Sequence, residues 1–83
     1  MKRNHEEKII IELVNQFKSL RLKSGLSHNK LAKQSDVTRS GISQIEAGKR
    51  RPTLLVCLKI AHGLDENLGE IIAECERKVY KNK

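Results

Sequence analysis

The chain has 83 residues and a formal net charge of +7 at pH 7, and its aromatic residues are one Phe and one Tyr, with no Trp. A chain of this length folds as one small domain with an aliphatic core, and it leaves little protein for an enclosed active site. The scarcity of aromatic residues also argues against the stacking surfaces with which proteins bind RNA and single-stranded nucleic acids.

The positive charge is concentrated in about two fifths of the chain. Residues 18–51 contain nine Lys or Arg residues and two acids, so this segment alone carries the net charge of +7, while the charges of the remaining 49 residues balance. This concentration favours an anionic partner, of which nucleic acid is the commonest. An acidic protein or a membrane surface would attract the same charge.

The sequence contains no signal for export or membrane insertion. The short apolar run 9–11 is interrupted by Glu12, and no stretch approaches the roughly 18 apolar residues of a membrane helix. The two cysteines, Cys57 and Cys75, are not closely spaced. We therefore expect a reduced, cytoplasmic protein.

The first half of the chain predicts two helices. Apolar residues at three- and four-residue steps indicate an amphipathic helix over about 6–24, which Gly25 ends. Ser27 is a good N-cap for a second, short helix that ends near Gln34 or Ser35.

A third helix follows a turn at Asp36. Thr38 is its expected N-cap and Gly48 closes it, so it is only about eight residues long. Pro52 and Thr53 open a fourth helix.

Gly63 lies just past the expected end of the fourth helix, and Asp65 or Asn67 caps a fifth that runs to roughly Val79. The last residues, 80–83, are expected to fray. Because nothing indicates a strand or a linker, the sequence predicts an all-α fold and a single domain over 1–83.

A set of residues in the middle of the chain carries a family resemblance. In chain order they are Leu26-Ser27, Leu31-Ala32, Val37-Thr38, Ile42-Ser43-Gln44-Ile45-Glu46, Gly48-Lys49 and Pro52. At these spacings they resemble the lambda-repressor and Cro-like helix-turn-helix family of phage and bacterial regulators, also called the xenobiotic-response-element (XRE) family. The match covers about 14–72 and leaves 5–13 as an N-terminal extension of the first helix.

The resemblance implies a compact five-helix domain in which helices two and three form the helix-turn-helix and the third lies in the DNA major groove. Arg pairs bidentately with guanine, Gln pairs with adenine, and Ser pairs with either base. By similarity to the family, we expect Arg39, Ser40 and Gln44 on the outward face of the third helix to contact bases.

The DNA phosphates need ligands of their own. Backbone N–H groups and the positive dipole at the start of a helix favour an anion, and a basic loop such as "GKRRP" is the usual second phosphate clamp of the family. The expected phosphate contacts are Ser27, His28, Asn29, Lys30, Thr38, Ser43, Lys49, Arg50 and Arg51.

Two further residues are expected to be structural. The family commonly pairs an arginine on the first helix with the glutamate that ends the third, and Arg21 and Glu46 occupy those positions. Two departures from the family pattern are Asp36, where the turn usually has Gly, and Gly41, which lies inside the recognition helix. We expect the DNA backbone or a neighbouring helix to come close at Gly41; the alternative is that Gly41 only makes the helix less stable alone.

The predicted fifth helix presents a further apolar stripe. It consists of Leu68, Ile71, Ile72, Cys75 and Val79 at steps of three and four residues. Part of this stripe is expected to pair with a second subunit, which would give a twofold dimer that reads a palindrome. The alternative is that the stripe only closes the core of the monomer.

Other chemistry has little support in the sequence. The histidines and cysteines show no metal-ligand spacing, and no nucleophile stands at a recognisable spacing from a base, so we expect no metal, no cofactor and no enzyme activity. The sequence predicts a sequence-specific repressor or autoregulator of transcription that binds double-stranded DNA, such as a restriction-modification controller or a small phage-type repressor. An antitoxin that also binds a toxin is the alternative, and association with RNA is a third, disfavoured interpretation.

Overall fold

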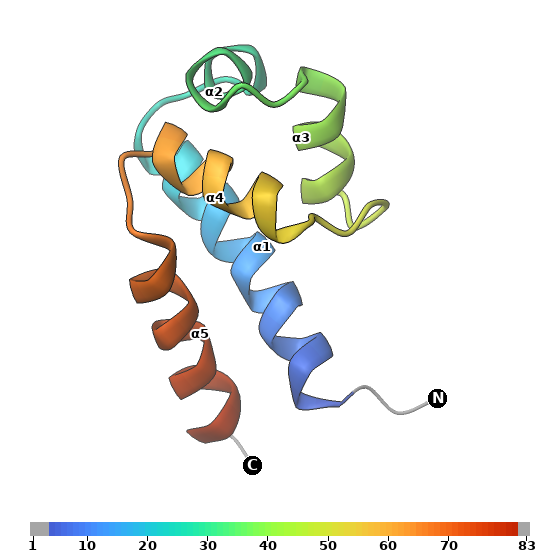
Figure 1. Cartoon of the computed structure of the whole chain (residues 1–83), viewed down its shortest axis with the longest axis vertical. Coiled ribbons are helices and arrows are strands. Elements are labelled where there is room, and N and C mark those ends of the chain that lie inside the picture. Colours follow the sequence, from blue (N-terminus) through green and yellow to red (C-terminus); the bar gives the residue numbers. More distant parts are fainter. Residues whose placement is uncertain (1–3, 82–83) are drawn as a thin grey trace.

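The computed structural model of the chain describes residues 4–81, and all regular secondary structure in that range is helical (Figure 1). The five helices are α1 (His5–Lys23), α2 (His28–Ser35), α3 (Arg39–Glu46), α4 (Leu54–Gly63) and α5 (Leu68–Lys81). The predicted all-α, five-helix architecture is therefore confirmed. None of the described helices is both long and apolar enough to span a membrane.

Short side chains fix where the helices begin. The side-chain oxygens of Ser27, Thr38 and Thr53 accept hydrogen bonds from the backbone N–H groups of Lys30, Gly41 and Val56 at 3.0–3.1 Å. Each of these bonds satisfies an N–H group that has no partner within its helix. The oxygen of Asn67 in the same way accepts from the N–H group of Glu70 at 3.0 Å, so Asn67 caps α5.

Left-handed residues end the helices. Gly25 has a φ of +69° after α1, and Gly48 has a φ of +77° after α3. The turn between α2 and α3 places Asp36 at a φ of 58°, which Asp tolerates better than most residues with a side chain.

Gly63 has a different role from the predicted one. It is the last residue of α4 rather than the residue beyond it, and Asp65 takes the left-handed conformation that follows, with a φ of 58°. A Cβ atom on Gly63 would lie 2.7 Å from the Cβ and 2.9 Å from the Cα of Ser35. The missing side chain therefore allows α4 to approach α2 closely.

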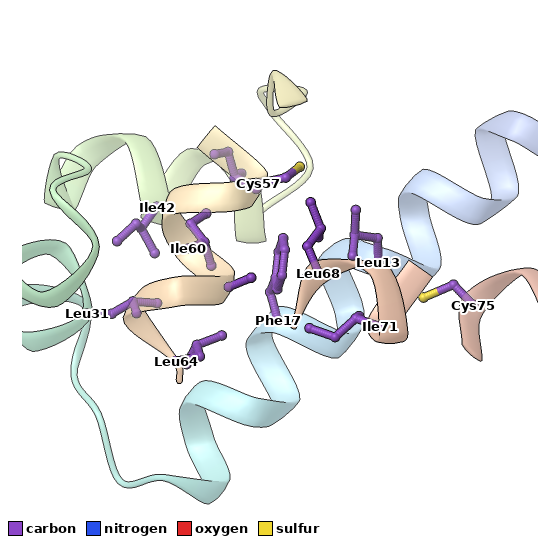
Figure 2. Packing of buried hydrophobic residues seen from close by; sticks show 12 residues of the cluster. Leu13, Phe17, Leu31, Ile42, Cys57, Ile60, Leu64, Leu68, Ile71 and Cys75 are labelled. Atoms are coloured by element: carbon purple, nitrogen blue, oxygen red, sulfur yellow. The ribbon is translucent and has the colours of Figure 1, made fainter. Parts of the chain in front are cut away.

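The helices enclose one core. α1 packs beside α5, α2 packs against α3 and α4, and Figure 1 shows α2 and α3 together at the end of the molecule away from the last turns of α5. In Figure 2, Phe17 of α1 points toward Leu68 and Ile71 of α5. The buried apolar residues are Leu13, Phe17, Leu31, Ile42, Ile45, Cys57, Ile60, Ala61, Leu64, Leu68, Ile71 and Cys75.

The N-terminal extension of α1 is part of this packing. The ring of His5 meets the ring of Tyr80 edge-on at a centroid distance of 5.1 Å, and the Glu12 carboxylate lies 3.4 Å from the Lys78 ammonium group. Tyr80 and Lys81 belong to α5 rather than to a frayed end, while residues 82 and 83 of the predicted frayed segment lie outside the described residues.

Candidate DNA-binding surface

Helix α3 has two different faces. Its inner face buries Gly41, Ile42 and Ile45 against the core. Its outer face exposes the side chains of Arg39, Ser40, Ser43 and Gln44. All the side chains on this outer face can donate or accept hydrogen bonds, and the face carries one positive charge and no negative charge.

A buried ion pair holds the end of α3. Glu46 accepts hydrogen bonds from Arg21, at 2.7 Å from Nε to Oε2 and 2.9 Å from Nη2 to Oε1. The third guanidinium nitrogen of Arg21, Nη1, donates to the carbonyl oxygen of Leu26 at 2.8 Å. The side chains of Arg21 and Glu46 are only 9% and 8% exposed, so the pair connects α1, the loop after it and α3 away from solvent.

His28 belongs to the same network. Its Nε2 lies 3.0 Å from Oε1 of Glu46, so this nitrogen has a partner inside the protein. Burial alone would raise the pKa of the Glu46 carboxyl, but the hydrogen bonds and positive charges of Arg21 and His28 outweigh burial and hold that pKa below its usual value. The network therefore favours the ionised carboxylate.

The start of α2 presents a second polar surface. Asn29 and Lys30 are exposed there, beside the capping residue Ser27. The first turn of α2 contains no acid, so no negative side chain there neutralises the positive end of the helix dipole. This helix start is suited to an anion.

The loop after α3 carries three exposed cations, Lys49, Arg50 and Arg51, which we call the clamp loop. The backbone N–H group of Lys49 donates to the carbonyl oxygen of Gln44 at 2.9 Å, which fixes the loop to the last turn of α3. Arg51 differs from the other two cations because it forms an ion pair with Glu7 of α1.

Gly41 makes room for three neighbours within the protein. A Cβ atom at this position would lie 2.9 Å from the Thr38 hydroxyl oxygen, 3.6 Å from Nη1 of Arg50 and 3.6 Å from Cγ1 of Val37. The close atoms within the chain therefore come from the turn before α3, the cap of α3 and the clamp loop, and not from a neighbouring helix. Gly41 allows the Arg50 guanidinium to lie near the first turn of α3.

The structure places the predicted dimer stripe mostly inside the monomer. Leu68, Ile71 and Cys75 are 6%, 8% and 0% exposed, whereas Ile72 and Val79 are half-buried. The first three side chains therefore have little surface left for a second subunit.

The helix with the most exposed leucines is instead α4. Leu54, Leu55 and Leu58 are 67%, 62% and 38% exposed, and we call them the α4 leucine surface. The sequence analysis did not find this surface, although the run "LLVCLKIA" contained the signal. A helix that is apolar around most of its circumference cannot bury every apolar side chain in so small a domain.

A metal centre finds no support in the part of the chain that the structure describes. Within residues 4–81, no three His, Cys, Asp or Glu side chains gather where they could hold an ion. Cys57 and Cys75 are both buried and unpaired with each other.

Comparison with known proteins supports the interpretation of α2 and α3 as a helix-turn-helix. A helix-turn-helix family model matches residues 17–71. Control protein C.MunI from Mycoplasma sp. is 38% identical over 71 residues, which cover 84% of this chain and 96% of that protein. The crystal structure of a point mutant of the restriction-modification controller protein C.Esp1396I superimposes with a TM-score of 0.79 at 24% identity, over 90% of this chain and 97% of that chain. This second likeness shows the fold.

Proposed function

This chain belongs to the helix-turn-helix family, as a DNA-binding transcriptional regulator of the restriction-modification controller type, and we propose that it binds a palindromic operator as a homodimer. The single observation that carries the proposal is the contrast between the two faces of α3. The inner face is packed and fixed, while the outer face offers Arg39, Ser40, Ser43 and Gln44 to solvent. Regulators of this type have no catalytic role.

Base recognition is assigned to three residues of the outer face. Arg39 can pair with O6 and N7 of a guanine and Gln44 with N6 and N7 of an adenine, and the Ser40 hydroxyl can donate or accept. The Gln44 amide nitrogen lies 3.4 Å from the Ser40 hydroxyl oxygen, so these two side chains stand next to each other on successive turns of α3. Neighbouring side chains of this kind can read adjacent base pairs.

Phosphate binding is assigned to the residues on either side of this face. At the start of α2 they are Ser27, Asn29 and Lys30; at the two ends of α3 they are Thr38, Ser43, Lys49 and Arg50. Such contacts supply affinity that does not depend on base sequence and that weakens as salt rises. His28 remains a proposed phosphate contact, and its Nε2 also connects α2 to Glu46.

For the dimer, the α4 leucine surface replaces most of the α5 stripe as the proposed contact. A second copy is the partner we propose, because the surface begins three residues after the clamp loop and is therefore continuous with the DNA-binding side of the chain. A twofold pair would present two α3 helices to half-sites about 34 Å apart. The half-buried Ile72 and Val79 remain candidates for the same contact.

Sedimentation equilibrium tests the dimer. Leu55→Glu should shift the protein to the monomer mass with an unchanged helical circular dichroism spectrum. Leu22→Glu is the matched control, since Leu22 is also exposed, at 59%, but lies on α1. A dimer that survives Leu55→Glu would exclude the α4 leucine surface.

The function is tested by DNA binding. The purified protein is titrated onto the duplex immediately upstream of its own gene and onto a scrambled duplex of equal length, over a series of salt concentrations. A preference of about a thousandfold or more for the upstream duplex, with a steep salt dependence for both, is expected of an autoregulator. Equal, weak binding to both duplexes would contradict that role.

A further inference from the structure

An acid on α1 holds one of the cations assigned to DNA by family resemblance. Nη1 of Arg51 pairs with Oε1 of Glu7, and Nη2 pairs with Oε2. Both nitrogens at the tip of the guanidinium group are therefore engaged with both oxygens of one carboxylate. This is the parallel, two-bond arrangement that arginine also makes with a phosphate group.

The pairing joins segments that are far apart in the sequence. Glu7 lies in the first turn of α1, within the N-terminal extension, and Arg51 lies in the clamp loop, 44 residues later. A hollow of about 260 Å³ between the extension and the loop is lined by Ile10, Ile11 and Pro52 as well as by the two charged residues. The first turns of α1 are thus positioned against the loop that follows the recognition helix.

The other two cations of the clamp loop are arranged differently. Within residues 4–81, Lys49 and Arg50 form no ion pair, and both side chains are exposed. Arg51 is also largely exposed, at 66%, so a phosphate could reach it. A phosphate can take both tip nitrogens of Arg51 only if Glu7 releases them, because one guanidinium edge holds one bidentate partner.

We propose that the Glu7 carboxylate is an internal competitor for DNA phosphate at Arg51, and that it sets the affinity of the protein for DNA without affecting which sequence is read. The proposal rests on the proposed DNA-binding function. Glu7 then acts in two ways: it occupies the phosphate-binding edge of Arg51, and it places a negative charge next to the DNA backbone. Arg51 offers the edge formed by its two tip nitrogens to a phosphate only in exchange for this carboxylate.

The experiment compares two substitutions in the same turn of α1. Glu7→Gln removes the competitor, and Glu6→Gln removes an exposed acid of equal charge at the neighbouring position, where no bond to Arg51 is involved. Each variant is titrated onto the upstream duplex and onto the scrambled duplex between about 0.05 and 0.3 M salt. The same two substitutions are then made in an Arg51→Gln background, and thermal melting verifies that every variant is folded.

Glu7→Gln should bind both duplexes about fivefold more tightly than the unmodified chain, with an unchanged ratio between them. The slope of log affinity against log salt should steepen by about 0.9, which corresponds to one additional phosphate contact. Glu6→Gln should give a smaller gain and no such steepening. In the Arg51→Gln background, Glu7→Gln should have no more effect than Glu6→Gln.

Two results would overturn the proposal. Equal effects of Glu7→Gln and Glu6→Gln would mean that only net charge matters, and weaker binding by Glu7→Gln would mean that Glu7 positions Arg51 for DNA rather than competing with it. A failure of the function itself looks different, because the unmodified chain would then show no preference for the upstream duplex.

Discussion

The two faces of α3 differ in how much of their bonding capacity the protein itself uses. On the inner side, Ile42 and Ile45 are 1% and 3% exposed, and Glu46 accepts from two partners at the end of the helix. On the outer side, among the described residues, the one side-chain hydrogen bond runs from Gln44 to the Ser40 hydroxyl at 3.4 Å. The eight residues of α3 thus combine a buried face that supports the fold with an outer face whose polar groups can bind DNA. Substitutions on the inner face should therefore lower stability, and substitutions on the outer face should weaken DNA binding.

The largest effect is expected on the inner side. Glu46→Ala leaves the Arg21 guanidinium buried without its carboxylate, which should lower the free energy of unfolding by about 3 to 5 kcal/mol. Urea denaturation followed by circular dichroism measures this loss. The matched outer-face variant, Gln44→Ala, should unfold at nearly the same urea concentration as the unmodified chain. Equal losses of unfolding free energy in Glu46→Ala and Gln44→Ala would contradict the proposed difference between the two faces.

On the outer side, the change should appear in binding and not in stability. Arg39→Ala should weaken binding to the operator by about 1 to 3 kcal/mol if Arg39 pairs with a guanine, and should relax the preference at that base pair. Competition titrations with operators altered one base pair at a time measure both effects. A uniform loss over all duplexes, with preferences unchanged, would make Arg39 a phosphate contact.

A smaller loss of stability is expected where α2 is supported by α4. Gly63→Ala places a methyl group 2.7 Å from the Ser35 Cβ, so the two helices must separate. Overpacking costs about 1 to 3 kcal/mol, and the better helix propensity of Ala offsets up to about 1 kcal/mol of this. Gly69→Ala is the control, because a Cβ there meets only the Asn67 side-chain oxygen, at 3.1 Å. Thermal unfolding of the two variants should therefore differ, with Gly63→Ala the less stable.

The smallest effect on the free energy of unfolding near neutral pH is expected from a change of pH. Since the folded chain holds the pKa of Glu46 below its usual value, the folded state binds this proton less readily than the unfolded state. The resulting stability is fully present above the usual glutamate pKa and is lost as pH falls through the lowered pKa. The difference in unfolding free energy between the unmodified chain and Glu46→Gln should thus shrink as pH falls below about 5. A constant difference down to pH 3 would contradict the lowered pKa.

The local features of the fold were predictable because they depend on neighbours in the sequence. Ser27, Thr38 and Thr53 cap their helices through bonds to residues three positions later, and Asp36 takes the left-handed turn that the family usually gives to Gly. The family position of Arg21 and Glu46 indicated their pairing in advance. The identity of the exposed residues on α3 followed from helical periodicity.

The features that sequence reasoning missed depend on contacts between distant segments. Gly63 is read as a helix terminator from its neighbours alone, and only the approach of Ser35 from α2 reveals its packing role. His28 and Arg51 are both plausible phosphate ligands by position, yet each meets a carboxylate supplied from elsewhere in the fold. The apolar stripe of α5 is equally periodic whether it faces a second subunit or, as for Leu68, its own core.

The two buried thiols report separately on two parts of the fold. Cys57 lies on α4 and Cys75 on α5, at 5% and 0% exposure, and burial raises the pKa of both thiols. A thiol reagent can therefore modify each cysteine only when its helix opens, and the labelling rate measures how often that opening occurs. Peptide mapping of partly labelled protein would give both rates from one sample. The labelling rate of each cysteine thus reports how often its own helix opens. Bound DNA should lower the labelling rate of Cys57 if the helix-turn-helix opens together with α4.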